Sequence, residues 1–410
     1  MDEHWSADLL SPESSTLTIN SGSSTIKFAQ FHGDRALDRR LHGKIEWSGS
    51  GPAALTFASA SGERARQPPS AFAQASAPAT LVDWLSAQAT FASVRAVGHR
   101  VVRGMDHKGP EPVTRELLDE LRRLVPDDPE HLPRELALIE AFADRHPDLP
   151  QVVCFDTTFH RTMPHVARVL AIPRRYQALG VERYGFHGLS YAYLMQALTE
   201  LGDPAASAGR VILAHLGNGA SMAAVLAGQS IDTSMGFTPA SGLPMGTRAG
   251  DLDPGLFPFL ARTERMTAET FERMVNHESG LLGLSERSSD MRVLLSREAT
   301  DERARAAIAY FCYQAKKWVG SFFAALGGLN TLVFAGGVGE NAPAVRARIC
   351  AGLQCLGIHL DERSNMNNDP VISAASSRVT VRVIRTDEER VIAEQTIQAL
   401  RETPRSGTAS

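Results

Sequence analysis

Two turns of the same design, set far apart in the chain, constrain the fold more than any other feature of the sequence. The first lies in residues 17–28 (LTINSGSSTIKF) and the second in residues 212–225 (ILAHLGNGASMAAV). Each joins two apolar strand patterns through small residues, and each is followed by a further turn signal, at 32–34 and 227–229, and a candidate third strand. Glycine permits the positive φ angles and close approach that let backbone N–H groups face an anion. The repeat therefore predicts two related domains that hold a nucleotide between them.

The composition is that of an ordinary globular enzyme. A chain of 410 residues, with 43% hydrophobic and 21% charged residues, is long enough for two or three domains. The net charge of −4 gives no electrostatic attraction to nucleic acid or to a membrane surface, so neither is expected as a partner. The polar segments 1–15 and 403–410 are expected to be disordered tails.

The cysteines do not form a recognisable cluster. Cys154, Cys312, Cys350 and Cys355 are scattered, and the last two, expected on one helix, lack the two-residue spacing of zinc or redox pairs. We interpret them as reduced thiols in the core of a cytoplasmic protein.

Strand and helix patterns alternate along the chain, which predicts an α/β fold. The irregular segment 232–254 is rich in Gly and Pro but contains residues typical of a core, so we expect it to be ordered and functional. The main predicted strands are 94–102, 151–155, 331–334 and 379–384, with a short one near 54–58, and the predicted helices are 81–90, 114–124, 136–145, 304–325, 344–356 and 389–400.

The first turn carries polar side chains suited to a phosphate. Asn20, Ser23, Thr25 and Lys27 lie on it or directly after it. Because alternate residues of a strand share one face, Thr25 and Lys27 present a hydroxyl and an ammonium group on the same side. An ordinary polar hairpin edge explains the pattern equally well.

Two arginines stand in surroundings that favour an anionic partner. Arg100 lies among apolar strand residues, where burial without such a partner is costly, and Arg248 lies between Gly246 and Gly250. Surface salt bridges are the alternative, but two such arginines from different halves of the chain favour an anion clamp. Asp156 ends a strand, where it can serve Mg²⁺ or cap the next turn.

Two histidines and a further glycine-rich turn complete the candidates. His187 can be a core residue with a satisfied ring or a donor to a developing anion. His215 precedes the second turn and can bind a phosphate. Residues 336–341 (GGVGEN) form a turn between strand and helix, as in nucleotide sites, but lack both the P-loop Lys-Ser/Thr pair and the GxGxxG spacing of a dinucleotide site.

Taken together, these segments are very specific, and the chain resembles the acetate kinase family of the acetate and sugar kinase/actin superfamily from about residue 17 to 400. The matching motifs are 20–27 (NSGSSTIK), 98–102 (GHRVV), 155–157 (FDT), 184–188 (YGFHG), 215–221 (HLGNGAS), 232–239 (DTSMGFTP), 246–254 (GTRAGDLDP), 288–292 (SSDMR), 336–341 (GGVGEN) and 386–389 (TDEE).

The resemblance implies a fold and a set of ligands. The fold is α/β, with two duplicated ribonuclease-H-like (actin-like ATPase) domains, mixed β-sheets flanked by helices and an active site in the interdomain cleft. One domain comprises residues 16–157 with 389–402, and the other residues 158–388. The resemblance further implies ATP/ADP and a small carboxylate as substrates, Mg²⁺ (alternatively Mn²⁺) as cofactor, a cytoplasmic location and a homodimer.

The resemblance also implies residue roles. Arg100 and Arg248 would hold the carboxylate and the transferring phosphoryl group, and His187 would donate to that group. Asn20, Asp156 and Glu388 would arrange Mg²⁺, with Asp156 counted among the catalytic residues. The acid pocket would comprise Val102, Phe186, Pro239 and the position of Glu130. The phosphates would be lined by Ser23, Thr25, Lys27, His215, Leu216, Gly217, Asn218 and Gly219, and the adenosine by Asp290, Met291, Arg292, Gly337, Val338, Gly339, Glu340 and Asn341.

Two segments depart from the family pattern. Residues 103–105 read RGM where the family has His-Gly-Gly, and 128–133 read DPEHLP where it has Ala-Pro-Leu-His-Asn-Pro. His131 is retained, but Glu130 replaces the Leu that encloses the methyl group of the substrate. A carboxylate there would be costly and would repel acetate. Glu130 therefore points away, pairs with Arg103 or another cation, or the acid accepted is not acetate.

The reaction implied is reversible phosphoryl transfer from ATP to acetate by direct in-line attack. A carboxylate is ionised at neutral pH and needs no general base, so catalysis rests on positioning and on neutralising charge. The alternatives are a kinase for propionate or another short carboxylate, an actin- or chaperone-type ATP-binding switch module, and an inactive homologue.

Overall fold

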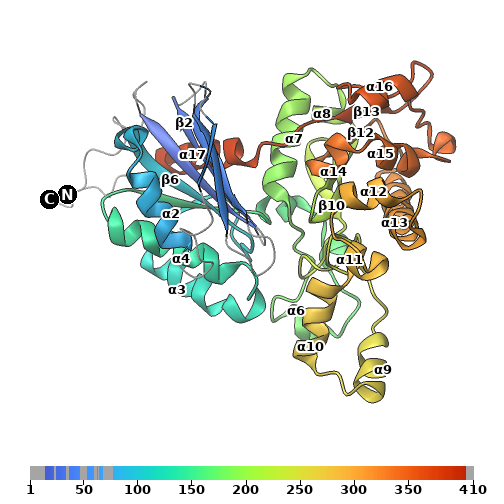
Figure 1. The fold of residues 1–410 in the computed structure, drawn as a ribbon, viewed down its shortest axis with the longest axis horizontal. Helices are drawn as coiled ribbons and strands as arrows, with labels where there is room; N and C mark the ends of the chain where they lie inside the picture. The colour runs from blue at the N-terminus through green and yellow to red at the C-terminus, as the bar shows by residue number, and fades with distance from the viewer. Residues whose placement is uncertain are drawn as a thin grey trace. The chain divides into compact units, whose positions relative to one another are not determined.

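The computed structural model describes residues 14–22, 25–33, 37–46, 53–59, 62, 64–67 and 77–402. The chain divides into two compact units, unit 1 (residues 1–158 and 387–410) and unit 2 (residues 159–386) (Figure 1). Most of the two expected tails lies outside the described residues. The expected N-terminal tail was too long, because Ser14 and Ser15 are buried and Ser15 already begins a strand.

Unit 1 is built on a mixed sheet. Its described part has the strand order β5-β4-β3-β2-β1-β6-β8-β7, in which β1 to β5 run antiparallel and β6 and β8 run parallel to β1. The strands are β1 (Ser15–Ser21), β2 (Thr25–His32), β3 (Asp38–Glu46), β4 (Ala54–Ser59), β5 (Arg64–Gln67), β6 (Val94–Val101), β7 (Glu111–Pro112) and β8 (Gln151–Phe155).

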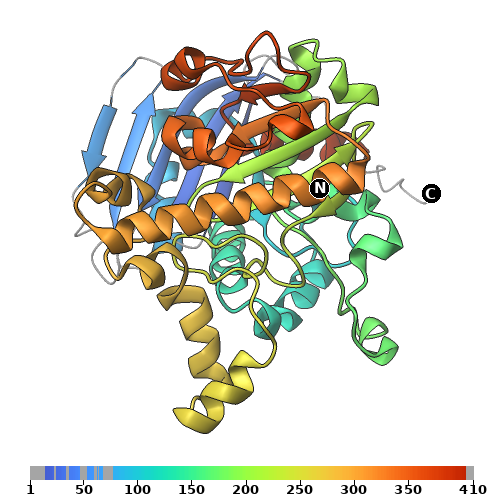
Figure 2. The same ribbon diagram turned by 90° about the vertical axis from the view of Figure 1, so that its right-hand side faces the viewer.

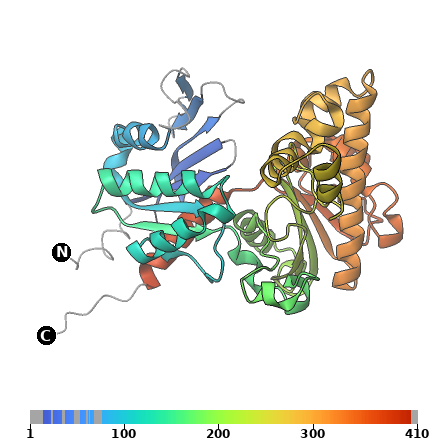
Figure 3. The same ribbon diagram turned by 90° about the horizontal axis from the view of Figure 1, so that it is seen from below.

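Helices cover both faces of this sheet. Leu17, Ile19 and Phe28 face one side and pack with α2 (Ala77–Ser86) and α4 (Leu132–Arg145). Ala29 and Phe31 face the other side, where Ala393 of α17 (Glu388–Glu402) covers them. Figure 3 shows α17 in red beside the blue strands, although it comes from the end of the chain. The remaining helices are η2 (Ala89–Ser93), α3 (Arg115–Arg123) and η3 (Val125–Asp127).

Unit 2 repeats the connectivity of unit 1. Its described strands have the order β11-β10-β9-β12-β13, with an antiparallel β9–β10–β11 meander and β12 and β13 parallel to β9. The same pattern in unit 1 is β3-β2-β1-β6-β8, so the two turns found in the sequence occupy equivalent places. The strands are β9 (Arg210–Leu216), β10 (Ala220–Leu226), β11 (Gln229–Thr233), β12 (Thr331–Ala335) and β13 (Thr380–Val383).

Helices also flank the second sheet. Tyr191 and Leu194 of α7 (Gly188–Glu200) pack against Leu213 and Val225, while the long helix α13 (Glu302–Leu326), orange in Figure 2, contacts β9 and β10. The other helices are η4 (Thr158–Thr162), α5 (His165–Arg168), α6 (Arg174–Gln177), α8 (Ala205–Ala208), α9 (Leu256–Thr263), α10 (Ala268–Arg273), η5 (Met274–Glu278), α11 (Gly280–Ser285), α12 (Met291–Arg297), α14 (Gly336–Asn341), α15 (Pro343–Cys350), η6 (Gln354–Leu356) and α16 (Glu362–Asn367). No helix in the described ranges is long and apolar enough to cross a membrane.

Several element predictions require correction. The expected helix 344–356 ends at Cys350, and Gly352 has a φ of 82°, so Cys355 lies in the separate short helix η6 and is exposed rather than in the core. The turn 336–341 is itself a helix, α14. The helices expected at 81–90 and 136–145 begin earlier, at Ala77 and Leu132, and the first of them ends at Ser86. The segment 232–254 starts in β11 and is otherwise irregular, with Met235, Leu243 and Met245 buried.

Candidate active site

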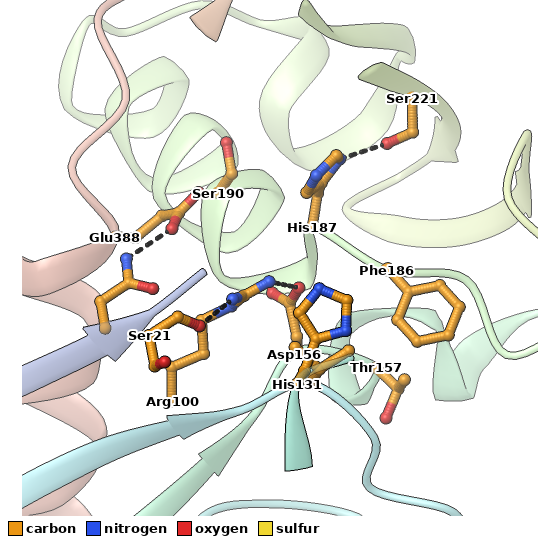
Figure 4. A network of polar contacts seen from close by, with 12 residues as sticks. Ser21, Arg100, His131, Asp156, Thr157, Phe186, His187, Ser190, Ser221 and Glu388 are labelled. Carbon is orange, nitrogen blue, oxygen red and sulfur yellow. Dashed lines mark hydrogen bonds and ion pairs between the residues drawn. The ribbon is translucent and has the colours of Figure 1, made fainter. Parts of the chain in front are cut away.

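Arg100 and Asp156 form a buried ion pair at the ends of two neighbouring strands of unit 1. Arg100 lies near the end of β6 and Asp156 follows β8, and the Arg100 Nη2 to Asp156 Oδ2 distance is 2.8 Å. The Nη1 of Arg100 donates to the carbonyl of Ser21 at 2.7 Å, whereas its buried Nε has no hydrogen-bond partner (Figure 4). Burial alone would lower the pKa of Arg100, but the carboxylates of Asp156, Glu388 and Glu135 raise it above its usual range. The guanidinium is therefore held charged, with one donor still open.

The side chains proposed for Mg²⁺ also meet in unit 1. Asn20 ends β1, and its Nδ2 donates to Glu388 Oε2 at 2.7 Å and to Glu389 Oε1 at 3.0 Å. Carboxylate and amide oxygens suit Mg²⁺, which binds few protein ligands and keeps several waters. Among the described residues, no group of three or more His, Cys, Asp and Glu side chains could hold a metal ion. The carboxylate and amide oxygens of Asn20, Asp156 and Glu388 are ligands of the kind that Mg²⁺ accepts, and its binding here stays a prediction.

The first phosphate turn is only partly described. Ser23 lies outside the described residues. Thr25 is half-buried and Lys27 is exposed, with its Nζ 3.9 Å from Glu389 Oε1. Thr25 and Lys27 both lie on β2, so the strand predicted to carry them is present, and their contact with a phosphate stays a prediction.

Two stacked histidines lie at the second turn, in unit 2. His187 precedes α7 in the left-handed conformation (φ 59°), and its ring centroid is 4.4 Å from that of His215. The His187 Nδ1 is 2.8 Å from Ser221 Oγ, and the His215 Nδ1 is 2.8 Å from Ser190 Oγ (Figure 4). These hydroxyl contacts fix the orientation of both rings.

Arg248 reaches the same place. A Cβ atom built on Gly219 would lie 3.2 Å from His187 Nε2 and 3.8 Å from Arg248 Nη1. The Nη1 of Arg248 is also 3.8 Å from Met245 Sδ. Unit 2 therefore brings together a histidine, an arginine and the glycine of a turn that permits close approach.

The residues proposed for the nucleotide surround the end of β9. The amide of Gly246 donates to the carbonyl of Asn218 at 3.0 Å, and a Cβ on Gly336 would lie 2.8 Å from the backbone of Leu216. Within α14, Glu340 Oε1 accepts from the amide of Gly336 at 3.0 Å, and Asn341 Nδ2 donates to the carbonyl of Gly337 at 2.9 Å. The turn 215–219, the loop at 246 and the helix carrying residues 337–341 are therefore adjacent.

The remaining proposed adenosine residues lie at the start of α12. Asp290 accepts from the amide of Arg292 and forms an ion pair with its guanidinium at 2.6 Å, and this hydrogen-bonded pairing lowers the pKa of Asp290. Met291 is buried. Their part in nucleotide binding stays a prediction.

The residues predicted to form the acid pocket are divided between the two units, and each is described within its own unit. Val102 in unit 1 and Phe186 in unit 2 are buried, and Pro239 is half-buried. Glu130 is exposed, and its charge acts on the guanidinium of Arg134, so its role in acid binding stays a prediction.

Two residues close to Glu130 in the chain, Asp128 and His131, are buried. His131 Nδ1 lies 2.9 Å from Asp128 Oδ1, and both residues are at least nine-tenths buried. Arg103 is also buried, and its Nη1 donates to the carbonyl of Asp127 at 3.3 Å. The two departures from the family pattern, 103–105 and 128–133, therefore pack close together.

Sequence reasoning missed Glu135. This residue is 2% exposed, and both of its carboxylate oxygens accept from the amide of Val102, at 3.2 and 3.3 Å. Burial raises the pKa of Glu135 well above its usual range, and the charge of Arg100 opposes the shift. The sequence does contain a pattern that indicates the burial of Glu135. With the helix begun at Leu132, Glu135 joins Leu136 and Ile139 on one apolar stripe at i, i+3, i+4 and i+7.

Comparison with known proteins decides the family. A family model described as the acetokinase family matches residues 15–394. The chain belongs to the acetokinase family. Within this family it is 42% identical to an acetate kinase of Methylocella silvestris, over 94% of this chain and 97% of that protein. It is 41% identical to a propionate kinase of Citrobacter rodentium, over 96% and 99% of the two chains.

A solved acetokinase structure agrees with the fold. An acetate kinase of Porphyromonas gingivalis matches with a TM-score of 0.84 and 35% sequence identity, covering 94% of this chain and 100% of that one. The predicted α/β fold of duplicated actin-like halves is confirmed.

Proposed function

We propose that this protein is an acetate kinase, which transfers the γ-phosphoryl group of ATP to acetate and gives acetyl phosphate and ADP reversibly. The observation that carries the proposal is the convergence of His187, Arg248 and Gly219 in a chain of the acetokinase family. Such a site supplies donors for an anion, and the proposed reaction does not use its histidine as a catalytic base. A carboxylate acceptor needs none, because it is ionised at neutral pH.

The chemistry follows from this donor set. A carboxylate oxygen of acetate attacks the γ-phosphorus, a new C–O–P linkage forms, and the bond to the β-phosphate oxygen breaks, leaving its electron pair on ADP. Protons are neither gained nor lost in this step. Arg100, with its open Nε donor, would bind the carboxylate, and Arg248 and His187 would neutralise charge on the phosphoryl oxygens.

Mg²⁺ is proposed as the cofactor, with Mn²⁺ as the alternative. Asn20 and Glu388, with Asp156, would hold it through water, and when bound it would neutralise charge on the β- and γ-phosphate oxygens. The side chains of this chain orient its waters and the substrates.

We further propose that units 1 and 2 are the two domains of the enzyme. A homodimer in the cytoplasm is inferred from the family resemblance alone. Light scattering during size-exclusion chromatography measures the mass in solution, and a value equal to one chain would contradict the dimer.

The proposal is tested by trapping the acyl phosphate with hydroxylamine, using Mg-ATP and formate, acetate, propionate or butyrate. Acetate is expected to give the highest kcat/KM. The likeness to a propionate kinase makes propionate the second candidate, and a clear preference for it would replace acetate in the proposal. ATP binding without product from any acid would exclude the kinase and favour an ATP-dependent switch.

A further inference from the structure

The first turn of α4 contacts two separate parts of the proposed site in unit 1. Arg134 and Glu135 are consecutive residues of this turn. Glu135 faces the end of β6, which carries Arg100 and is followed by Val102, and Arg134 faces the turn that follows β1. Neither residue belongs to the motifs by which the family was recognised.

Glu135 holds the backbone where the strand ends. Its two oxygens accept the amide of Val102 just past β6, where the ladder to β8 no longer supplies an acceptor. A buried carboxylate also loses hydration, so it is a costly way to satisfy a single amide. Because of this cost, we infer that Glu135 serves to hold the Val102 amide in place rather than to fill space in the core.

Arg134 holds the adjoining phosphate turn. Its Nη1 donates to the carbonyl of Gly22 at 3.0 Å, and Arg100 donates to the carbonyl of the preceding residue, Ser21, at 2.7 Å. The turn is closed by the amide of Gly22 donating to the carbonyl of Thr25 at 2.7 Å. Two arginines therefore bind consecutive carbonyls, those of Ser21 and Gly22, at the start of this turn.

We propose that Arg134 and Glu135 are positioning residues of the kinase, a proposal that rests on the function proposed above. Glu135 fixes the amide of Val102, and through it the wall of the acid pocket and the end of the strand that carries Arg100. Arg134 fixes the carbonyl of Gly22 and through it the turn that binds the phosphates. The pair therefore sets acid affinity and nucleotide affinity from one turn of one helix.

The acid half is tested with Glu135→Ala, Glu135→Asp and Glu135→Gln. Loss or retraction of the acceptor in the Ala and Asp variants should raise KM for acetate about tenfold, since small displacements of positioning groups cost rate and binding. KM for ATP should change less than twofold. The Gln variant keeps an oxygen that accepts the Val102 amide and should restore most of the affinity for acetate.

The control for this half is Glu140→Gln, because Glu140 lies on the same helix, is half-buried and pairs with Arg122. If the Ala variant does not fold, the comparison of Asp with Gln carries the test. Acetate KM values equal to wild type in both the Ala and Asp variants, or in Asp alone where Ala does not fold, would overturn the role of Glu135.

The nucleotide half is tested with Arg134→Met and Arg134→Lys. The Met variant should raise KM for ATP about tenfold and leave KM for acetate nearly unchanged, and Lys, which keeps a donor, should recover part of the loss. The matched control is Arg145→Met at the end of α4, where the arginine pairs with Asp83. An unchanged KM for ATP, with only a lower melting temperature, would make Arg134 a structural residue.

The activity of the wild type distinguishes a failure of the proposed function from a failure of the roles given to Arg134 and Glu135. If the wild type forms no acetyl phosphate, the proposed function is wrong, and the positioning roles of Arg134 and Glu135 are wrong with it. If the wild type is active and the Glu135 and Arg134 variants retain its KM values, only the inference fails.

Discussion

His99 and Arg100 are neighbours on β6, yet they lie in opposite electrostatic surroundings. Successive residues of a strand face opposite sides of a sheet. His99 faces the apolar side, where its ring lies edge-on to Phe142 and its Nε2 is 2.8 Å from Gln151 Oε1. Burial lowers the pKa of His99 to about 4, whereas the carboxylates around Arg100 keep the guanidinium charged. One strand thus carries a neutral structural histidine beside a charged candidate for anion binding.

The sequence indicates the types of the site residues better than their contacts. Arg100, Arg248 and His187 stood out because a charged or polar residue among apolar ones or glycines requires a partner. The contact of Glu135 with Val102 could not be predicted, because it depends on how α4 packs over the end of β6. The exposure of Glu130 likewise depends on the direction of one side chain at the start of that helix.

Substitution of Arg248 by Leu is expected to lower kcat by about a hundredfold or more, because it removes a charge that we propose stabilises the transferring phosphoryl group. The melting temperature should stay close to that of the wild type. The control is Arg262→Leu on α9, where the arginine is exposed. Turnover near the wild-type value in Arg248→Leu would remove this residue from the site.

The stability of the protein should fall in acid partly because of His99. Its pKa is lower in the folded chain than in the unfolded one, so the unfolded state binds more protons and the free energy of unfolding decreases as pH falls from 6.5 towards about 4. The full shift corresponds to about 3 kcal/mol. Urea unfolding of wild type and His99→Asn at pH 7 and pH 4.5 measures it.

The variant should lose less stability than the wild type between these two pH values. His165→Asn, which replaces an exposed histidine, is the control and should behave as the wild type does. Equal losses in wild type and His99→Asn would show that other groups govern the acid response.

At the scale of elements, α17 lies unusually close to β6. A Cβ atom on Gly98 would lie 2.1 Å from Thr396 Oγ1 and 2.7 Å from Ile392 Cγ2, so a side chain at this position would separate helix from strand. Strands such as β8 were predicted from their apolar runs, since a buried strand needs little beyond its own residues. Helix limits were predicted less well. For α4 a local start signal was overlooked, because Pro133 lies in the first turn of the helix that begins at Leu132.

Gly98→Ala is therefore expected to destabilise unit 1 by about 2 kcal/mol, the usual effect of overpacking. Gly320→Ala, in the middle of α13, is the matched control, because no atom lies within 4 Å of the added Cβ. That change should raise stability by about 1 kcal/mol, since alanine favours a helix more than glycine does. Thermal unfolding of both variants provides the test, and a neutral Gly98→Ala would mean that α17 can move away at no cost.

At the scale of the whole molecule, the duplicated connectivity follows from the pair of turns read in the sequence. Both halves place a hairpin and a third strand beside two parallel strands. Within the described ranges of the chain, the outer strands β4 and β5 and the helices α9 to α12 have no counterpart in the other unit. The strands β4 and β5 belong to unit 1 and the helices α9 to α12 to unit 2, so a comparison of the two turns could not predict them.

Deletion of residues 388–410 should unfold unit 1 and leave unit 2 folded. The deletion removes α17, which covers Ala29 and Phe31, whereas every strand and helix of unit 2 remains. Hydrogen exchange measured by mass spectrometry should show lost protection in β1, β2 and β6 and retained protection in β9, β10 and β12. Unchanged protection in β1 and β6 would contradict the structural role given to α17.

The origin of α17 at the end of the chain also sets an order for folding during translation. Unit 2 is continuous in sequence and can fold on the ribosome once its last strand, β13, has emerged. Residues 14–158 are synthesised first, but their sheet waits for a helix that is translated after the whole of unit 2. Until then Ala29 and Phe31 lack their cover, which makes this face of the nascent chain the surface that a chaperone would need to shield.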